Sequence, residues 1–325
     1  MKFPVKAAAA AGLIATSSIG LAVGMIRTQR VPRENPPSGH FVGEAGRRLH
    51  YVQVGEGPDL VLIHGASMNL QEMLAGPVDL LARTHRVTLF DRPGHGHSDA
   101  DLEHASPQEQ AARIHAAVSE LGLERPIVVG HSLGGTVALA YGAAYPEETG
   151  GLVLLAPLSH AVWGVGHIGP ALHAAPGLGA GLSWGPFALF DPAVMRFATS
   201  AIFAPQRPTP RFNRCVARGM LSLPSAMRAD GADFMLATMA LQTLRRGYAE
   251  FQVPVHVIVG AADRVLKPDW HGRRLAREMP SARLTELPGL GHMLHHFDPK
   301  AVLAAVEEVR ARIPHSAQPA DAGWT

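Results

Sequence analysis

One serine of this chain stands in a context that could make its hydroxyl a nucleophile. Gly130-His131-Ser132-Leu133-Gly134 has the pattern Gly-x-Ser-x-Gly, with an apolar run before it and a helical pattern after it. A serine on such a sharp strand-to-helix turn needs small residues two positions before and after it, which Gly130 and Gly134 supply. Ser132 would then project at a helix N-terminus, where backbone N–H groups favour a developing negative charge. The sequence therefore predicts nucleophilic attack by Ser132.

A serine hydroxyl is a weak nucleophile, so it needs a general base that a third group holds in place. Asp263 and His292 each follow directly after a late strand-like run, in the order acid and then histidine. Side chains at the carboxyl ends of parallel strands meet outside one edge of the sheet. His295 and His296 compete with His292 for the role of base, but they lie beyond its glycine-bounded loop. We therefore predict that His292 is the base and that Asp263 orients it.

Attack on a carbonyl also creates an oxyanion, which needs hydrogen-bond donors. The backbone N–H of Leu133, the residue after the serine, is the first predicted donor. The N–H of Ala66 is the second, because His64-Gly65-Ala66 ends an early apolar run. Gly65 allows the backbone to approach a substrate closely, and we expect His64 to be structural. This chemistry requires no organic cofactor and no metal, so we predict neither.

These residues need a scaffold that brings distant segments to one edge. From about residue 40 onward, short β-branched runs alternate with longer amphipathic runs. Such alternation predicts an α/β fold with a mostly parallel central sheet flanked by helices. The expected strands are 49–54, 60–63, 87–90, 127–129, 152–155, 255–259 and 282–287, and the expected helices lie near 70–83, 107–121, 134–145, 269–279 and 298–312.

The alternation stops between Pro157 and Phe251. A stretch of about ninety-five residues is too long for one loop in a compact domain. We predict that 157–251 is a largely helical insertion that covers the active site as a lid, while a second packing domain without a gating role remains an alternative. The core would then comprise 40–156 and 252–313, followed by a flexible C-terminal tail over 314–325. The Trp, Phe and Met residues of the insertion suit an apolar substrate pocket, and they would equally serve as ordinary core.

The N-terminal segment has a different character. Residues 7–26 carry no charge and are flanked by basic residues on both sides, and a helix of twenty residues rises about 30 Å, the thickness of a bilayer core. We expect residues 1–26 to be a membrane anchor or, alternatively, a signal segment whose removal leaves a secreted protein. The prolines of 27–39 predict an extended linker. The expected location is a bacterial-type membrane. We favour the extracytoplasmic side for the domain, although basic residues on both sides of the segment leave the orientation open.

Composition excludes several other classes of protein. The chain has 325 residues, of which 47% are hydrophobic and 17% charged, so there is ample material for a large core. A single cysteine, Cys215, excludes a disulfide scaffold. The formal net charge is +2, and no block of like charges stands out, so we predict no nucleic-acid partner. We infer no obligate protein partner either.

Taken together, these motifs resemble the α/β-hydrolase fold, in the serine esterase and haloperoxidase-like branch of that superfamily. The resemblance covers roughly residues 40–313 outside the insertion. It implies the fold and the triad, and it implies a structural role, without chemistry, for Asp91 and Arg92. The matching motifs are His64-Gly65, Phe90-Asp91-Arg92-Pro93-Gly94-His95-Gly96-His97-Ser98, the Ser132 turn, Gly260 to Asp263, and Gly291-His292, with Pro36 to Gly39 ahead of them.

The resemblance also narrows the reaction. Epoxide hydrolases and haloalkane dehalogenases of this fold use an aspartate nucleophile, whereas this chain has Ser132, which favours acyl transfer. We expect a small-molecule substrate, namely a carboxylic ester of small or medium size and apolar character, cleaved through an acyl-enzyme. Cofactor-free haloperoxidase or perhydrolase activity and C–C bond hydrolysis would use the same triad and stay open. A non-catalytic binding module of this fold is the remaining alternative.

Overall fold

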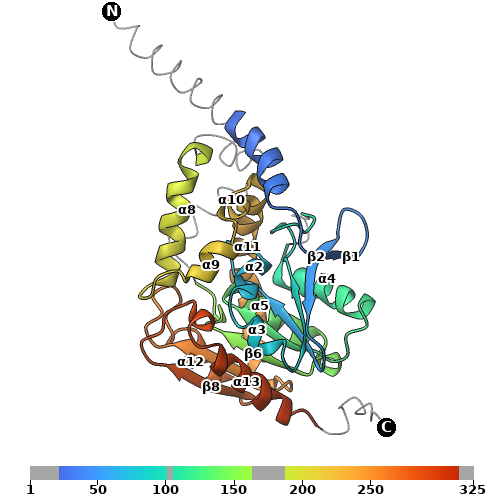
Figure 1. Ribbon diagram of the computed structural model, residues 1–325. Helices are drawn as coiled ribbons and strands as arrows, with labels where there is room; N and C mark the ends of the chain where they lie inside the picture. Colours follow the sequence, from blue (N-terminus) through green and yellow to red (C-terminus); the bar gives the residue numbers. More distant parts are fainter. Residues whose placement is uncertain (1–21, 101–104, 163–186, 315–325) are drawn as a thin grey trace, which may run out of the picture.

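A central sheet organises the computed structural model, which describes residues 22–100, 105–162 and 187–314 (Figure 1). Its eight strands run in the order β1-β2-β4-β3-β5-β6-β7-β8. Strands β1 and β2 pair antiparallel, as do β2 and β4, and every other neighbouring pair is parallel. The predicted fold class is confirmed. The strands are β1 His40–Val42, β2 Leu49–Val54, β3 Asp59–Ile63, β4 Arg86–Phe90, β5 Ile127–His131, β6 Gly151–Leu155, β7 Val255–Gly260 and β8 Ala282–Leu287.

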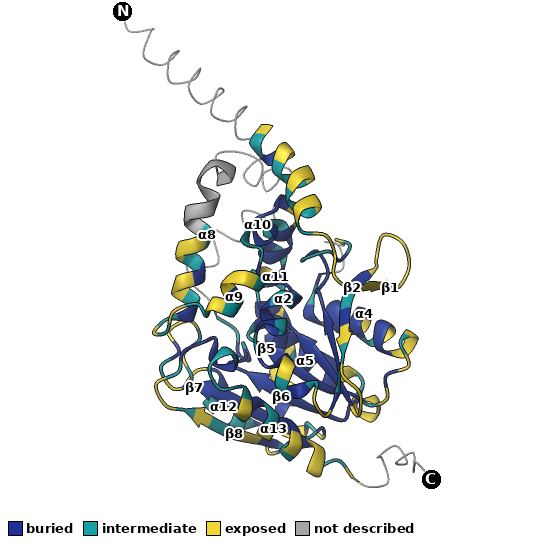
Figure 2. Cartoon of the chain, viewed as in Figure 1, coloured by how far each residue is buried: buried dark blue, intermediate teal, exposed yellow. Residues whose placement is uncertain are grey.

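Helices cover both faces of this sheet, which explains why its central strands read as continuous apolar runs. Every residue of β3, β5, β6 and β7 is buried (Figure 2). Helices α4 Pro107–Glu120, α5 Leu133–Ala144 and α12 Gly272–Glu278 pack their apolar side chains into one core cluster. Helices α2 Leu70–Leu74, α3 Val78–Leu81 and α13 Pro299–Ala311 pack into the other.

Two details of the core differ from the expectation. The helix expected near 70–83 is divided into α2 and α3, because Gly76-Pro77 interrupts the pattern and Pro77 caps the second helix. Strand β1 was not predicted. It is only three residues long and pairs with β2 alone, so it has little sequence in which a pattern could appear.

The described part of the insertion is largely helical. It contains α8 Phe187–Phe203, α9 Pro210–Cys215, α10 Arg218–Leu221, α11 Pro224–Leu244 and the 3-10 helix η3 Arg245–Glu250. Helix α11 packs against α5 and α4 of the core. Figure 1 shows the insertion standing over one end of the sheet, with α8 at its outer side.

The prediction of an extended linker over 27–39 is wrong for residues 27–34. Residues 22–34 are helical, because tertiary packing overrides the weak helix preference of this stretch. The side chain of Val31 packs with Met220, Leu223 and Ala226 of the insertion, and Arg27 donates to Ser222 Oγ at 2.8 Å. The first segment of the chain therefore rests on the insertion.

Most of the expected anchor or signal segment, residues 1–21, lies outside the described residues, and so does the expected tail from residue 315 onward. Within the described part of the chain, no helix combines the length and apolarity that crossing a membrane requires.

Candidate active site

Ser132 occupies the link between β5 and α5 in a conformation that few L-residues adopt. Its φ is 53° and its ψ is −116°, a sparsely populated region that costs energy unless the surroundings enforce it. A Cβ on Gly130 would lie 2.4 Å from the carbonyl oxygen of Gly134, and a Cβ on Gly134 would lie 2.4 Å from that of Ile63. Glycine is thus required on both sides of the serine, as the sequence pattern predicts.

A cavity of about 500 Å³ lies between this turn and the insertion. Ser132, His292, Leu133, Ala66 and Gly65 all line it. The structure therefore brings the predicted nucleophile, base and donor residues to one cavity wall. The other lining residues are mainly apolar. They include Met195, Ile202, Leu221 and Phe234 of the insertion and Met68 and Met293 of the core.

Asp263 lies behind the histidine and holds it by a direct hydrogen bond. Its Oδ2 is 2.8 Å from His292 Nδ1, and both side chains are buried. Burial opposes the charge of Asp263, but the hydrogen bond and charge of His292 outweigh that effect and lower the pKa of Asp263. Its Oδ1 accepts the backbone N–H groups of Val265 and Leu266 at 2.7 and 3.0 Å. An ionised Asp263 only accepts, so Nδ1 of His292 carries the proton and Nε2 is left as a base.

The two predicted oxyanion donors belong to different segments that line the same cavity. Leu133 is the first residue of α5, where a backbone N–H has no partner within the helix. Ala66 follows β3. Within the described residues, neither N–H donates to another group, so both are available to a substrate oxygen.

His64 lies behind the loop after β3 and does not line the cavity. Its Nδ1 is 2.8 Å from the carbonyl oxygen of Gly65, and its Nε2 accepts the backbone N–H of Arg92 at 3.0 Å. Burial, together with the charge of Arg92, lowers the pKa of His64 well below 6.5. His64 is therefore a neutral ring that holds the loop, in keeping with the structural role expected for it.

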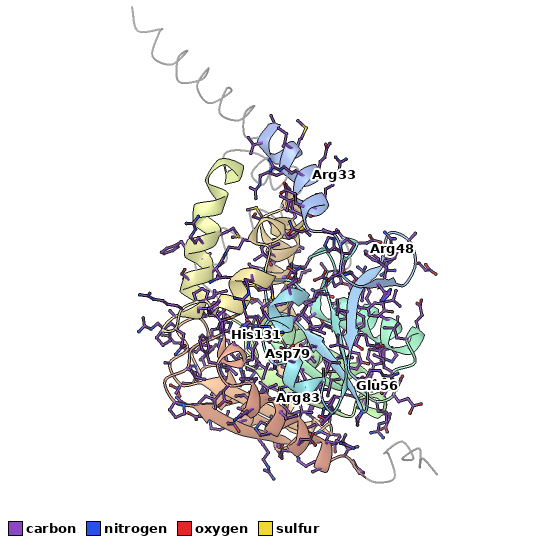
Figure 3. All side chains as sticks on the ribbon, in the orientation of Figure 1. Arg33, Arg48, Glu56, Asp79, Arg83 and His131 are labelled. Atoms are coloured by element: carbon purple, nitrogen blue, oxygen red, sulfur yellow. The ribbon has the colours of Figure 1, made fainter. Side chains whose placement is uncertain are left out.

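Sequence reasoning missed Glu72, a completely buried carboxylate beneath the serine turn. Its Oε1 lies 2.5 Å from His295 Nε2 and 3.2 Å from His131 Nδ1. Figure 3 shows His131 near the middle of the molecule. Glu72 thus ties the residue before Ser132 to the segment after His292. Burial opposes its charge, but His131 and His295 lower the pKa of Glu72 well below its usual value. In sequence Glu72 looks like any glutamate on a helix, so no local signal identifies it.

Glu72, His295 and His296 also have ligand atoms within 4.8 Å of one another, a spacing that could hold a metal ion. Two ligands of one tetrahedral zinc ion, each bound at its usual distance, lie about 3.4 Å apart. The 2.5 Å between Glu72 Oε1 and His295 Nε2 is instead the separation of a charge-assisted hydrogen bond. Glu72 and His295 therefore form a hydrogen-bonded support of the turn, and His296 Nε2 lies 3.9 Å from the same carboxylate oxygen.

Comparison with known proteins supports the α/β-hydrolase fold and indicates that the reaction is a hydrolysis. The sequence model described as Alpha/beta hydrolase family matches residues 60–306. An uncharacterised protein of Mycobacterium tuberculosis is 29% identical over 279 residues, which cover 84% of this chain and 81% of that protein. A 2-hydroxy-6-oxononadienedioate/2-hydroxy-6-oxononatrienedioate hydrolase of Paraburkholderia phymatum is 39% identical over 113 residues, or 33% of this chain and 39% of that enzyme. The crystal structure of an alpha/beta hydrolase fold protein from Burkholderia ambifaria superposes with a TM-score of 0.67 at 26% identity, covering 83% of this chain and 97% of that one.

Proposed function

Because this chain belongs to the alpha/beta hydrolase family and is a hydrolase of that fold, we propose that it is a serine hydrolase acting on carboxylic esters. The observation that carries the proposal is the shared cavity of Ser132 and His292, with Asp263 bonded to the far side of the imidazole. These groups occupy the roles of nucleophile, base and orienting acid in a serine triad.

In the proposed mechanism, His292 Nε2 takes the hydroxyl proton while Ser132 Oγ attacks the ester carbonyl carbon. The carbonyl oxygen becomes an oxyanion that accepts hydrogen bonds from the N–H groups of Leu133 and Ala66. His292 then protonates the departing alkoxide, and the alcohol leaves. Water attacks the acyl-enzyme with His292 again as base, which releases the carboxylic acid and restores Ser132. Asp263 stabilises the imidazolium in both steps.

The cavity wall favours an uncharged, apolar substrate. Among its described lining residues there is no arginine and no lysine, and the polar side chains besides His131 and the proposed catalytic pair are Ser67, Thr199 and Thr238. The substrate named for the Paraburkholderia relative is a dicarboxylate, and carboxylates in a closed pocket need cationic partners. An ester with a medium apolar acyl group therefore suits this cavity better than a dicarboxylate whose C–C bond is cleaved.

The test combines a mechanism-based label with a series of substrates. We would treat the full-length chain with a fluorophosphonate, locate the adduct by peptide mass spectrometry, and measure turnover of p-nitrophenyl esters from C2 to C12. We expect labelling on Ser132 and a higher kcat/KM for medium acyl chains than for acetate. Labelling without ester turnover would instead point to peroxide or C–C chemistry at this triad. A chain that takes no label would not be a serine hydrolase.

The acid limb of the pH profile gives an independent prediction. Burial lowers the pKa of His292 below 6.5, although Asp263 partly opposes this shift. The neutral imidazole is the active form, so a lowered pKa keeps the enzyme active at more acidic pH. We expect kcat/KM to fall tenfold per pH unit on the acid side, with a midpoint below pH 6.5, the same for two esters of different reactivity. A midpoint above pH 6.5 would show that the hydrogen bond and charge of Asp263 outweigh the effect of burial on His292.

A further inference from the structure

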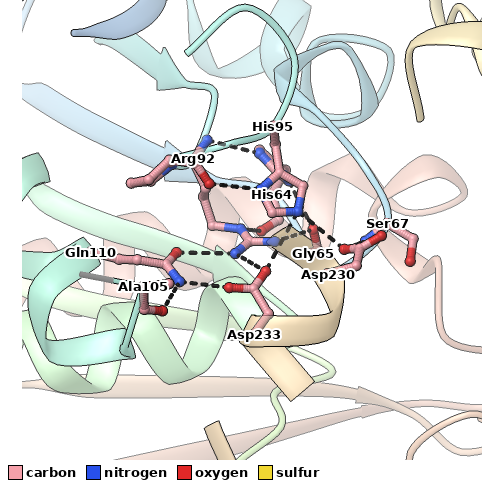
Figure 4. Close-up of polar contacts among 10 residues, drawn as sticks. His64, Gly65, Ser67, Arg92, His95, Ala105, Gln110, Asp230 and Asp233 are labelled. Carbon is pink, nitrogen blue, oxygen red and sulfur yellow. Dashed lines mark hydrogen bonds and ion pairs between the residues drawn. The ribbon is translucent and has the colours of Figure 1, made fainter. Parts of the chain in front are cut away.

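A second buried network joins the insertion to the loop that carries Ala66. It consists of Arg92, His95, Gln110, Asp230 and Asp233, which we call the clasp (Figure 4). The two aspartates belong to α11 of the insertion, Gln110 belongs to α4, and Arg92 and His95 follow β4. The clasp lies outside the residues to which the mechanism assigns chemistry.

Arg92 joins one side of the loop to Asp233. Its Nε donates to the carbonyl oxygen of His64 at 3.1 Å, and its Nη2 donates to that of Gly65 at 3.0 Å. Its Nη1 donates to Asp233 Oδ2 at 2.6 Å and to Gln110 Oε1 at 3.0 Å. The side chains of Arg92 and Asp233 are 0% and 2% exposed. A guanidinium does not lose its proton in a protein, so this buried charge depends on Asp233.

Asp230 fixes the other side of the same loop. Its Oδ1 accepts the backbone N–H of Ser67 at 2.7 Å and lies 3.1 Å from His95 Nε2. Burial opposes the charge of Asp230, but His95 and Ser67 outweigh burial and lower its pKa. Ser67 has a φ of 54°, a left-handed conformation that needs support from its surroundings.

The peptide that carries the Ala66 N–H is therefore held at its own carbonyl oxygen by Arg92, which Asp233 anchors, and the next N–H along the chain is held directly by Asp230. We propose that Asp230 and Asp233 are positioning residues for the oxyanion hole, so that α11 sets the direction of the Ala66 N–H. This inference rests on the proposed function, since it concerns stabilisation of the oxyanion. The same helix contributes Phe234 and Thr238 to the cavity wall. Contact of the substrate with α11 and alignment of the donor are thus linked through one rigid element.

The decisive comparison is between Asp233→Asn and Asp59→Asn. Asp59 is a matched control: its side chain is 5% exposed, it binds the Arg86 guanidinium through both oxygens, and it accepts the backbone N–H of Glu124. However, it stands at the start of β3, at the opposite end of the strand from Ala66. Complete loss of one oxyanion donor costs about 10²- to 10³-fold in kcat. For a misdirected donor we expect a fall of about 10- to 100-fold in Asp233→Asn, with KM within about threefold, and no more than about a twofold change in Asp59→Asn.

Two further readouts separate positioning from general destabilisation. A trifluoromethyl ketone forms an oxyanion on Ser132, so its Ki should rise in Asp233→Asn by the same factor by which kcat/KM falls. Asp230→Ala removes the acceptor of the Ser67 N–H, and amide hydrogen exchange at Ser67 should accelerate at least tenfold relative to Asp59→Asn. This exchange measurement reports the link even if Asp233→Asn does not fold.

The outcomes distinguish the two proposals. Wild-type labelling and ester turnover establish the serine hydrolase, and their absence would remove both proposals together. If the wild type is active but Asp233→Asn keeps kcat within twofold of Asp59→Asn, the positioning role is wrong while the triad stands. Unchanged exchange at Ser67 in Asp230→Ala would overturn it as well.

Discussion

Replacing Ser132 with alanine is expected to reduce kcat for an ester by about four to six orders of magnitude. The substitution removes the hydroxyl that His292 would activate to form the acyl-enzyme, and it leaves the oxyanion donors in place. The strained backbone at φ 53° is equally available to alanine and to serine, so we expect the thermal midpoint to stay within about 2 °C. Steady-state turnover of a p-nitrophenyl ester and calorimetry of the same sample measure both quantities.

A hydroxyl elsewhere in the same cavity provides the control. Thr199 lines the cavity, and its Oγ1 donates back to the carbonyl oxygen of Met195 in its own helix. Thr199→Val should therefore change kcat by no more than a few-fold. Residual activity in Ser132→Ala above about one part in a thousand would show that another group performs the attack.

Replacing Asp263 with asparagine should be almost as damaging, with a fall in kcat of about 10⁴-fold at neutral pH. The oxygen of the new amide would still accept the N–H groups of Val265 and Leu266, so the loop should keep its shape. The amide nitrogen, however, would face His292 Nδ1 as a donor. The imidazole would then carry its proton on Nε2, where it cannot accept the Ser132 proton. Kinetics together with ¹⁵N NMR of the histidine ring report the rate and the tautomer.

Asp298 supplies a suitable comparison for this substitution. It caps α13 by accepting the N–H of Ala301 at 3.0 Å, and it follows His292 closely in the chain. Asp298→Asn keeps that acceptor and should leave kcat within about twofold, because asparagine caps helices as well as aspartate does. If Asp263→Asn retained more than a tenth of wild-type kcat, another acid would have to orient His292.

The fold was predictable because its strands carry strong local signals. Strands β3, β5, β6 and β7 are buried on both faces, so they appear in sequence as nearly continuous apolar runs. Gly130 and Gly134 were predictable for a different reason: no side chain fits where each of them meets a carbonyl oxygen. Ser132 and Asp263 followed from their positions just after two of these strands, β5 and β7, whereas His292 followed from its place after β8, which is only partly buried.

The contacts of the supporting residues were not predictable because they join distant segments. Glu72 meets His295 across 223 positions of sequence, and Arg92 meets Asp233 across 141. Glu72 and Asp233 look in sequence like ordinary charged residues of a helix, and the structural role that the resemblance implies for Arg92 does not identify its partner. The helix over 22–34 escaped prediction similarly, since Pro32 within it and Pro36 and Pro37 after it suggest extended chain, and only contacts with the insertion, such as that of Val31, favour a helix.

That N-terminal helix changes how far the domain can move from whatever precedes it. A flexible linker of 13 residues has an end-to-end distance of about 20 Å and leaves the attached domain free to turn in any direction. Residues 22–34 are instead a packed rod, bound to the insertion through Val31 and Arg27. The chain thus enters the molecule beside α10 and not beside the sheet (Figure 1). The N-terminal helix is thus held in one orientation against the same insertion whose helices α8, α10 and α11 contribute side chains to the cavity wall.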